Sequence, residues 1–406
     1  MASPERNAKP PILVFEMTWS GTTHAPGNGS TIQTMAAAFP DRDVHFFAEP
    51  GHLQEVRRNA VLANDPRVTF HPIAISQLYR GRTGIVAWRR LIRECVTLWR
   101  GVRQVAPSGR CLVMLISATC TATFAAAWVA RLFPEMAVQV GLHGNLNDMD
   151  SRRSRNPAAR SLDMRSAVTR DHGPRVRFLV LEPGIRSMLA RRDTGAAART
   201  DVLPLPINIA EYQPADAVWP PAPLRVGFVG QATEAKGIGT FLDLAADLRA
   251  RHGDRIAFHL IGRGMPGMDS SVFAPLEEMP TSDHLPREEF IRRLKALHYV
   301  LLPFRPGYYD LAASGALIDA VTWLKPVIAT RAGFVGDFFA GAGDIGYLCD
   351  DAQQMRSRLE ALLADPDPAR YAAQVAALRA ERDRRTPDAL AETYRRIIHS
   401  NFPWLT

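Results

Sequence analysis

Short apolar runs alternate with amphipathic stretches along most of the chain. Uninterrupted apolar runs are typical of strands buried in a parallel sheet, and apolar residues spaced three or four apart are typical of helices that cover such a sheet. We expect strands at residues 12–16, 44–48, 112–116, 138–142 and 178–181, then at 225–229, 257–261, 299–302 and 326–329, with helices including 240–251, 287–297 and 389–398. The alternation predicts an α/β protein with two Rossmann-like, doubly wound domains.

A proline-rich stretch separates the two series of strands. It reads PLPINIAEYQPADAVWPPAP, and proline opposes regular structure because it lacks a backbone donor. A chain of 406 residues is long enough for two domains. We expect a first domain over residues 1–210, a linker over 211–223, a second domain over 224–385 and a C-terminal helix over 386–406.

Residues 111–130 form an uncharged stretch of membrane-spanning length, CLVMLISATCTATFAAAWVA. Serine and threonine interrupt it, and it divides into a leucine-rich strand, a polar turn and an alanine-rich helix. We favour the buried strand, turn and helix over a transmembrane helix.

The composition is that of a folded protein. Hydrophobic residues make up 47% of the chain and charged residues 22%, which are globular values. The four cysteines have no C-x-x-C spacing, so neither a disulfide framework nor a zinc site is indicated. The N-terminus, MASPERNAKPP, lacks the pattern of a signal peptide, and we expect a cytoplasmic protein.

The positive net charge of +8 is concentrated in two regions. Residues 79–110 hold about eight arginines against Glu94 alone, on a helical pattern AWRRLIRECVTLWRGVRQV, and SRRSRNPAARSLDMR follows at residue 151. One interpretation is a solvated basic face whose apolar residues meet the core. The other is attraction to an anionic membrane or to a phosphate-bearing substrate. Nucleic acid is disfavoured because no zinc-finger or RNP motif accompanies the charge.

The first candidate ligand loop is VGFVGQATEAKGIGTFLDL, where a strand leads through Gly230, Lys236 and Gly237 into a helix. Glycines let backbone N–H groups approach an anion, a helix N-terminus adds positive potential, and a lysine supplies a point charge for a phosphate. The spacing fits neither the P-loop nor the dinucleotide pattern. The alternative is an ordinary strand-to-helix turn with a surface lysine.

The second candidate loop lies in HYVLLPFRPGYYDLAASGALIDAVTWLKPVIAT. Its strand ends at Pro303, and Ser314, Gly315 and Ala316 open a helix whose N–H groups can meet a diphosphate. Asp319 lies about one turn further on, where its carboxylate can accept hydrogen bonds from a ribose diol. The alternative role of Asp319 is to complement the charge of the helix N-terminus.

Together these segments resemble the C-terminal domain of GT-B glycosyltransferases of the group-one, mainly retaining, E-x7-E class, which includes bacterial polysaccharide enzymes. The family's successive motifs correspond to FVGQATEAKGIGTF, FHLIGRG, HYVLLPF and YYDLAASGALIDAVTWLKPVIAT over about residues 224–350. The resemblance implies that the two domains face each other across a cleft and that the second domain binds a nucleoside diphosphate sugar. It also implies a C-terminal helix that crosses back to the first domain. It assigns nucleotide and diphosphate binding to Gly230, Gln231, Lys236, Gly262, Arg263, Arg305, Ser314, Gly315, Ala316 and Asp319.

The first half resembles the acceptor-binding domain of this family through shorter segments. TTHAPGNGSTIQTMAAAF lies where a Gly-rich loop precedes the first helix, and AVQVGLHGNLND brings a strand to the family's histidine beside the donor sugar. The resemblance places catalytic roles on His143, Lys236 and Asp310, and acceptor-side roles on His24, Gly27, Gly29 and Asp148. The alternative for His143 is a histidine that only caps a strand end.

Two positions depart from the family pattern. Gln231 stands where the family has an arginine before its Lys-Gly pair, and Leu311 stands where it has the first glutamate of E-x7-E, with Asp310 one residue out of register. Arg305 or Arg263 could supply the missing cation from a neighbouring loop. Recognition of the donor sugar and retention of configuration are therefore left open.

We expect transfer of a sugar from a nucleoside diphosphate sugar to a hydroxyl of a glycan or lipid-linked glycan. No metal or cofactor is expected, because a cation and helix N-termini can stabilise the leaving diphosphate. An inverting reaction would need a base, for which Asp148, Asp150, Glu182 and His24 are candidates.

The rival functions are those of a sugar-nucleotide epimerase of GT-B fold and of a non-catalytic sugar-nucleotide-binding protein. The expected location is cytoplasmic, and the basic helix adds the expectation of peripheral attachment at an anionic inner membrane face.

Overall fold

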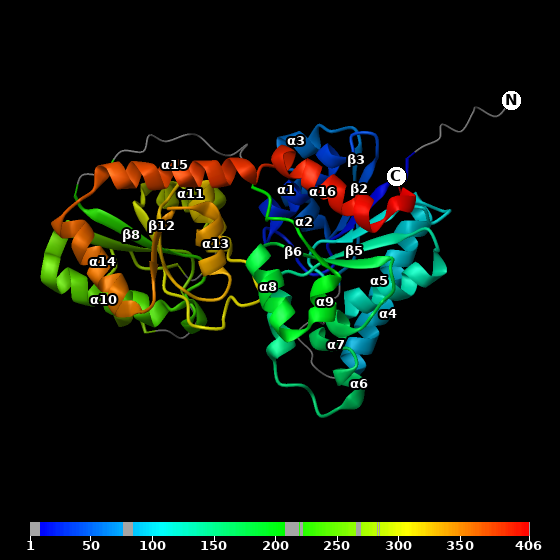
Figure 1. Cartoon of the computed structure of the whole chain (residues 1–406), viewed down its shortest axis with the longest axis horizontal. Helices are drawn as coiled ribbons and strands as arrows, with labels where there is room; N and C mark the ends of the chain where they lie inside the picture. The colour runs from blue at the N-terminus through cyan, green and yellow to red at the C-terminus, as the bar shows by residue number, and fades with distance from the viewer. Residues whose placement is uncertain are drawn as a thin grey trace. The chain divides into compact units, whose positions relative to one another are not determined.

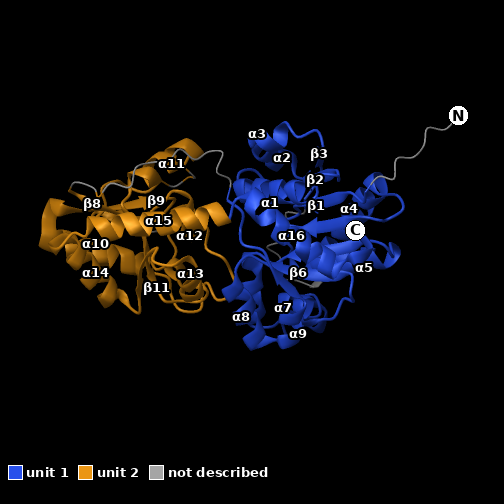
Figure 2. Ribbon diagram, turned by 45° about the horizontal axis from the view of Figure 1, so that its top comes forward, with its two compact units in different colours: residues 1–210, 385–406 blue, residues 211–384 orange. Residues whose placement is uncertain are grey.

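The structure is a computed structural model that describes residues 9–75, 84–207, 219, 222–264, 269–281, 283 and 285–405. The chain divides into two compact units, shown as a cartoon in Figure 1 and in separate colours in Figure 2. Unit 1 comprises residues 1–210 and 385–406, and unit 2 comprises residues 211–384. Most of the predicted linker, residues 211–218, 220 and 221, lies outside the described residues.

A seven-stranded parallel sheet forms the centre of unit 1, in the order β3-β2-β1-β4-β5-β6-β7. The strands are β1 (Ile12–Phe15), β2 (Val44–Ala48), β3 (Val68–Pro72), β4 (Leu112–Leu115), β5 (Ala137–Gly141), β6 (Val176–Val180) and β7 (Thr200–Val202). The register pairs Ile12 with both Val44 and Leu112. The strand order reverses between β1 and β4, and ligands of doubly wound sheets bind outside the carboxyl ends of strands at such a point.

The last helix of the chain, α16 (Pro387–Asn401), packs against the first, α1 (Ala25–Ala38). The ring centroids of Tyr394 and Phe39 are 6.1 Å apart, and Arg395 Nε donates to Ala38 O at 2.7 Å. The end of the chain is therefore part of the core of unit 1. The other helices of this unit are α2 (Pro50–Val56), α3 (Ala60–Ala63), α4 (Gly84–Val105), α5 (Cys120–Leu132), α6 (Pro157–Arg160), α7 (Met164–Thr169), α8 (Pro183–Arg192) and α9 (Thr194–Ala198), with the 3-10 helix η2 (Gly144–Asp150).

Unit 2 contains a five-stranded parallel sheet in the order β12-β11-β10-β8-β9. Its strands are β8 (Leu224–Val229), β9 (Ile256–Ile261), β10 (Tyr299–Leu302), β11 (Val327–Thr330) and β12 (Gly346–Cys349). Its helices are α10 (Ile238–His252), α11 (Arg287–Ala296), α12 (Gly315–Thr322), α13 (Val335–Ala342), α14 (Ala352–Ala364) and α15 (Pro368–Arg384), with the 3-10 turn η3 (Glu234–Lys236) before α10. The strand order reverses between β8 and β10, so the loops after these two strands are the expected ligand loops.

The predicted fold class and strands are confirmed, each strand to within two residues. Residues 111–130 form the buried strand β4 and most of helix α5, and no helix within the described ranges is long and apolar enough to cross a membrane. The pattern did not indicate β3, β7 and β12. All three are edge strands, and partial exposure or short length deprives each of a continuous apolar run.

Candidate active site

The loops after β8 and β9 meet in unit 2. Gly230 N donates to Ile261 O at 2.8 Å, and Ala232 N donates to Arg263 O at 3.0 Å. Gly262 has a φ of 152°, and a Cβ at this position would lie 2.0 Å from Gly230 O. Only glycine permits so close an approach of two backbones. The structure therefore brings together Gly230, Gly262 and the backbone of Arg263, which the sequence assigned to nucleotide binding.

The loop after β8 continues through Lys236 into α10. Thr233 Oγ1 accepts a hydrogen bond from Lys236 N at 3.3 Å and caps the turn η3. Gly237 then adopts a φ of 81°, and a Cβ there would lie 1.8 Å from Pro303 O at the end of β10. Because this approach also requires glycine, the Lys-Gly pair holds Lys236 between the loops after β8 and β10.

The side chain of Lys236 is half-buried and returns over the end of β8. A Cβ added to Gly230 would lie 3.2 Å from Lys236 Nζ. Burial lowers the pKa of Lys236 from its ordinary value, and the carboxylate of Asp319 on α12 acts in the opposite direction. The two predicted site residues, far apart in sequence, therefore interact electrostatically at the carboxyl edge of the sheet.

The N-terminus of α12 supplies backbone donors at the same edge. Ser314 is fully buried, and its Oγ accepts from Leu317 N at 3.3 Å, so its hydroxyl caps the helix. Gly315 is exposed, and a Cβ added to it would meet nothing within 4 Å. Ala316 is buried beneath it. The helix N-terminus is therefore open to an anion, and its backbone rather than the Ser314 side chain offers the donors.

The structure also shows the surroundings of the positions that depart from the family pattern and of Arg305, the arginine expected to compensate. Leu311 is fully buried and belongs to the core, with Asp310 half-buried beside it. Arg305 Nη2 forms an exposed ion pair with Glu234 Oε2 at 2.6 Å. An arginine that is already paired offers a ligand less charge. Gln231 is half-buried in the loop after β8 and brings no charge.

A buried carboxylate lies at the carboxyl end of β1 in unit 1. Glu16 is fully buried and accepts hydrogen bonds from Thr18 N at 2.7 Å, Trp19 N at 3.0 Å and Asn28 Nδ2 at 3.2 Å. Burial raises the pKa of Glu16 to about 7, against the opposing effect of these donors. Glu16 therefore fixes the loop after β1 to helix α1.

The same network extends to α2 through His52. Its Nδ1 lies 2.8 Å from Gly21 O and its Nε2 lies 2.9 Å from Asn28 Nδ2. Because a carbonyl oxygen can only accept, Nδ1 carries the proton and Nε2 accepts from Asn28. None of Glu16, Asn28 and His52 was among the site residues predicted from the sequence. The available signal was an acid directly after the apolar run of the first strand.

The pKa of Glu16 leads to a testable effect of pH on stability. The folded-state pKa of about 7 lies above the ordinary value of 4.5, so the folded protein binds the proton more tightly. This contribution to stability is complete below pH 4.5 and is lost as the pH rises through 7, amounting to about 3 kcal/mol. Glu16→Gln should remove that decline in the free energy of unfolding, measured by urea denaturation from pH 5 to 8. An identical pH slope in wild type and variant would contradict the assignment.

His24 and His143 lie side by side at the same edge of unit 1. Their ring centroids are 5.1 Å apart, edge to face, and the ring of Trp19 lies 4.9 Å from that of His24. Burial, with a smaller effect of His24, lowers the pKa of His143 to about 3. His143 is therefore neutral at neutral pH and can hydrogen-bond to a sugar without bringing a charge.

The predicted glycine loop before the first helix is wrong. Helix α1 begins at Ala25, so Gly27 and Gly29 lie within its first turns. Pro26 is in the first turn as well, where its missing N–H would have had no helical partner. The turn into this helix is instead made by His24, whose φ is 61°.

Two of the four predicted base candidates are held in ion pairs. Asp150 Oδ2 lies 2.6 Å from Arg192 Nη2. Glu182 is almost fully buried and binds Arg385 through both carboxylate oxygens, at 2.7 and 3.0 Å. Both carboxylates are therefore occupied by arginine side chains and are less accessible to a substrate hydroxyl.

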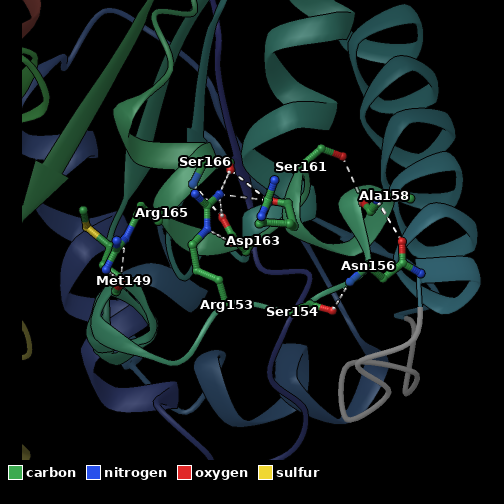
Figure 3. Close-up of polar contacts among 10 residues, drawn as sticks. Met149, Arg153, Ser154, Asn156, Ala158, Ser161, Asp163, Arg165 and Ser166 are labelled. Carbon is green, nitrogen blue, oxygen red and sulfur yellow. Dashed lines mark hydrogen bonds and ion pairs between the residues drawn. The ribbon is translucent and has the colours of Figure 1, made fainter.

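The third candidate, Asp148, lines a cavity of about 520 Å³ in unit 1. The cavity lies at the carboxyl ends of three strands, because Trp19 follows β1, Thr119 follows β4 and Asn145 follows β5. Figure 3 shows polar contacts of several residues that line this cavity, among them the contact of Arg153 with Asp163 on the segment before α7. This is a second place in the chain where a ligand can meet strand ends.

Comparison with known proteins matches residues 223–365 to the family described as glycosyl transferases group 1. A search of curated proteins finds no match. Solved structures align along almost the whole chain. Sucrose-phosphate synthase from Thermosynechococcus elongatus has 16% identity and a TM-score of 0.67, covering 98% of this chain and 100% of that one. HepE from Anabaena, in complex with UDP, has 15% identity and a TM-score of 0.63, covering 96% and 100%. The UDP-forming α,α-trehalose-phosphate synthase from Burkholderia vietnamiensis has 12% identity and a TM-score of 0.62, covering 97% and 99%.

The matched family segment contains all three loops around Lys236. The solved structures align with both units. At identities of 12–16% this similarity establishes the fold alone. Residues 223–365, which make up most of unit 2, therefore match the family of group 1 glycosyl transferases, and the chain as a whole has the GT-B fold.

Proposed function

We propose that this protein is a glycosyltransferase that moves a sugar from a nucleoside diphosphate sugar to an acceptor hydroxyl. The observation that carries the proposal is the convergence of Lys236, Asp319 and the open N-terminus of α12. A cation and backbone donors suit a diphosphate, and a carboxylate suits ribose hydroxyls. The structures of HepE from Anabaena hold UDP and UDP-glucose, which supports a uridine nucleotide as the first donor to test.

In the proposed reaction, the bond from the anomeric carbon to the diphosphate oxygen breaks and a bond to the acceptor oxygen forms. Negative charge grows on the leaving diphosphate, where Lys236 Nζ and the first N–H groups of α12 stabilise it. We assign this role to them without a metal ion. His143 and Asp310 are the proposed contacts of the donor sugar.

The acceptor also loses a proton, and its destination decides the stereochemical result. Transfer to the departing phosphate oxygen, on the same face of the sugar, retains the configuration. Transfer to a protein carboxylate on the opposite face inverts it. Asp148 is the proposed base for that second route, because Asp150 and Glu182 are occupied by arginines.

A donor panel tests the proposed activity. The protein is incubated with UDP- and GDP-sugars, and released nucleoside diphosphate is measured with and without glycan acceptors. We expect slow release without acceptor and faster release with it. An epimerase would convert the donor sugar without an acceptor, and a binding protein would leave every donor intact while gaining thermal stability. Either result would contradict transfer.

We further propose that α4 and α5 form a surface that contacts a membrane. Seven of the ten large hydrophobic side chains exposed among the described residues are on these two helices: Ile85, Trp88, Ile92, Val96, Trp99, Trp128 and Leu132. Exposed arginines at positions 89, 93, 100, 103 and 131 surround them. Glu94, the acid of α4, is buried against Arg90 at 2.8 Å. A solvated basic face explains the arginines but not the exposed tryptophans, which suit an anionic lipid interface.

This α4–α5 surface favours a lipid-linked acceptor, as in glycolipid or cell-surface polysaccharide synthesis at the inner membrane face. The double variant Arg93→Gln/Arg100→Gln should weaken sedimentation with phosphatidylglycerol vesicles about 30-fold at low salt, since each arginine near such a surface contributes about 1 kcal/mol. Arg155→Gln/Arg191→Gln removes the same charge from exposed positions outside this surface and should change little. Equal binding to phosphatidylcholine vesicles, or insensitivity to salt, would overturn the proposal.

A further inference from the structure

Among the described residues, four arginines line the cavity in unit 1, and two of them are neutralised within the protein. Arg90 Nε lies 2.8 Å from Glu94 Oε1, and both side chains are buried. Arg153 binds Asp163 through Nε at 2.8 Å and Nη2 at 3.3 Å, and its Nη2 also donates to Ser166 Oγ at 2.7 Å. These two arginines therefore build the wall and are not available to a ligand.

The other two arginines, Arg152 and Arg165, have no carboxylate partner among the described residues. Arg165 donates from Nε at 3.0 Å and from Nη2 at 2.7 Å to the same acceptor, Met149 O, as Figure 3 shows. A carbonyl oxygen orients the guanidinium without cancelling its charge. Arg152 is exposed at the cavity rim, next to the hydroxyl of Ser151. Among the described lining residues, two cations therefore lack a carboxylate partner, one of them fixed in orientation. The lining carboxylates are Asp148 and Asp163, and Asp163 is bound by Arg153.

The remaining lining is partly apolar and connects this cavity to the α4–α5 surface. Leu162 and Met164 contribute aliphatic wall, and Ala87 and Arg90 come from the first turns of α4. The exposed side chains of Ile85 and Trp88 are on the same turns. A ligand with an anionic group and an adjoining apolar part therefore matches both the cavity and its surroundings.

We infer that the acceptor of this enzyme carries a phosphate group and that Arg152 and Arg165 bind that phosphate in the unit 1 cavity. The inference rests on the proposed glycosyl transfer and names the class of its acceptor. Planar guanidinium groups match phosphate oxygens in geometry and charge, and an arginine remains protonated at every relevant pH. Asp148, the base proposed for an inverting reaction, lines the same cavity.

Binding of three probes tests the inference by titration calorimetry on the full chain. Dodecyl phosphate represents a lipid phosphate, glucose 1-phosphate a soluble sugar phosphate, and dodecyl maltoside an uncharged amphiphile. We expect wild type to bind one of the phosphates and not the maltoside, and Arg152→Gln/Arg165→Gln to weaken that binding about 100-fold, as for the loss of two charge-assisted contacts. Preference for dodecyl phosphate identifies a lipid source, and preference for glucose 1-phosphate identifies a soluble one.

Controls separate this inference from folding and from the donor site. Arg155→Gln/Arg191→Gln removes the same charge outside the cavity and should bind the phosphate like wild type. Arg152→Gln alone removes a side chain without a described partner, so a folding defect cannot explain its loss of affinity. UDP should stabilise wild type and Arg152→Gln/Arg165→Gln equally. If UDP stabilised neither protein, that result would count against the proposed function and not against the phosphate site. Phosphate binding that is absent from wild type, or unchanged in the variants, would overturn the inference.

Discussion

Replacing Lys236 with alanine is expected to lower kcat/KM for sugar transfer by about 100- to 1000-fold, the effect of removing a preorganised donor from a developing anion. Lys236 is held between the loops after β8 and β10, because a Cβ at Gly237 would clash with the backbone of Pro303. Its charge is desolvated and lies near Asp319, so no solvent rearrangement is needed when the leaving diphosphate becomes more negative. The measurement is release of nucleoside diphosphate from the donor found in the panel.

Lys295→Ala is the matched control for that variant. Lys295 lies on α11, with its Nζ 4.9 Å from the ring centroid of Trp323, away from the loops after β8 and β9. The Lys295→Ala variant removes the same side chain and charge as Lys236→Ala. We expect its kcat/KM to stay within about two-fold of the wild-type value, as for a surface change away from the site. Full activity of Lys236→Ala, or an equal loss in both variants, would refute the role given to Lys236.

Replacing Arg385 with alanine should reduce the free energy of unfolding of unit 1 by about 3 to 5 kcal/mol, because it leaves the buried carboxylate of Glu182 without its partner. The two side chains are 5% and 2% exposed, and both bonds of the pair are short, at 2.7 and 3.0 Å. Arg385 stands between α15 and α16, so the pair anchors the point where the chain returns to unit 1. Urea denaturation measures the effect.

Arg58→Ala gives the comparison within unit 1. Arg58 pairs with Glu55 at 2.9 Å but is 73% exposed, so its loss should change the free energy of unfolding by less than about 1 kcal/mol. Glu182→Ala should be as destabilising as Arg385→Ala, and the double variant should be far less destabilising than the sum of the two. Additive effects would show that the buried pair does not act as a unit.

The central strands were predictable from sequence for a physical reason. A strand buried on both faces must be apolar at every position, as β1 and β4 are, and such runs are visible without a structure. Edge strands have no such requirement, so β3 and β7 left no comparable signal. The start of α1 was misjudged because Gly27 and Gly29 suggest a loop, whereas Pro26 is well suited to the first turn of a helix.

Some residues of the candidate sites were predictable from the sequence and others were not. Lys236 and Asp319 lie in contiguous motifs at strand ends, so their residue types and spacing indicated a ligand. Glu16 forms its network with side chains from α1 and α2, and no local pattern joins these positions. The partners Glu182 and Arg385 are 203 residues apart, half the length of the chain, so no local pattern revealed that this carboxylate at a strand end is paired.

The central claim is that Lys236 and the N-terminus of α12 bind the diphosphate of a nucleotide, and titration calorimetry with UDP and uridine tests it most directly. We predict that wild type binds UDP about 100-fold more tightly than uridine, as two or more charge-assisted contacts would give. In Lys236→Ala the affinity for uridine should be unchanged and most of the preference for UDP should be lost. Equal affinity of UDP for wild type and Lys236→Ala would contradict the account.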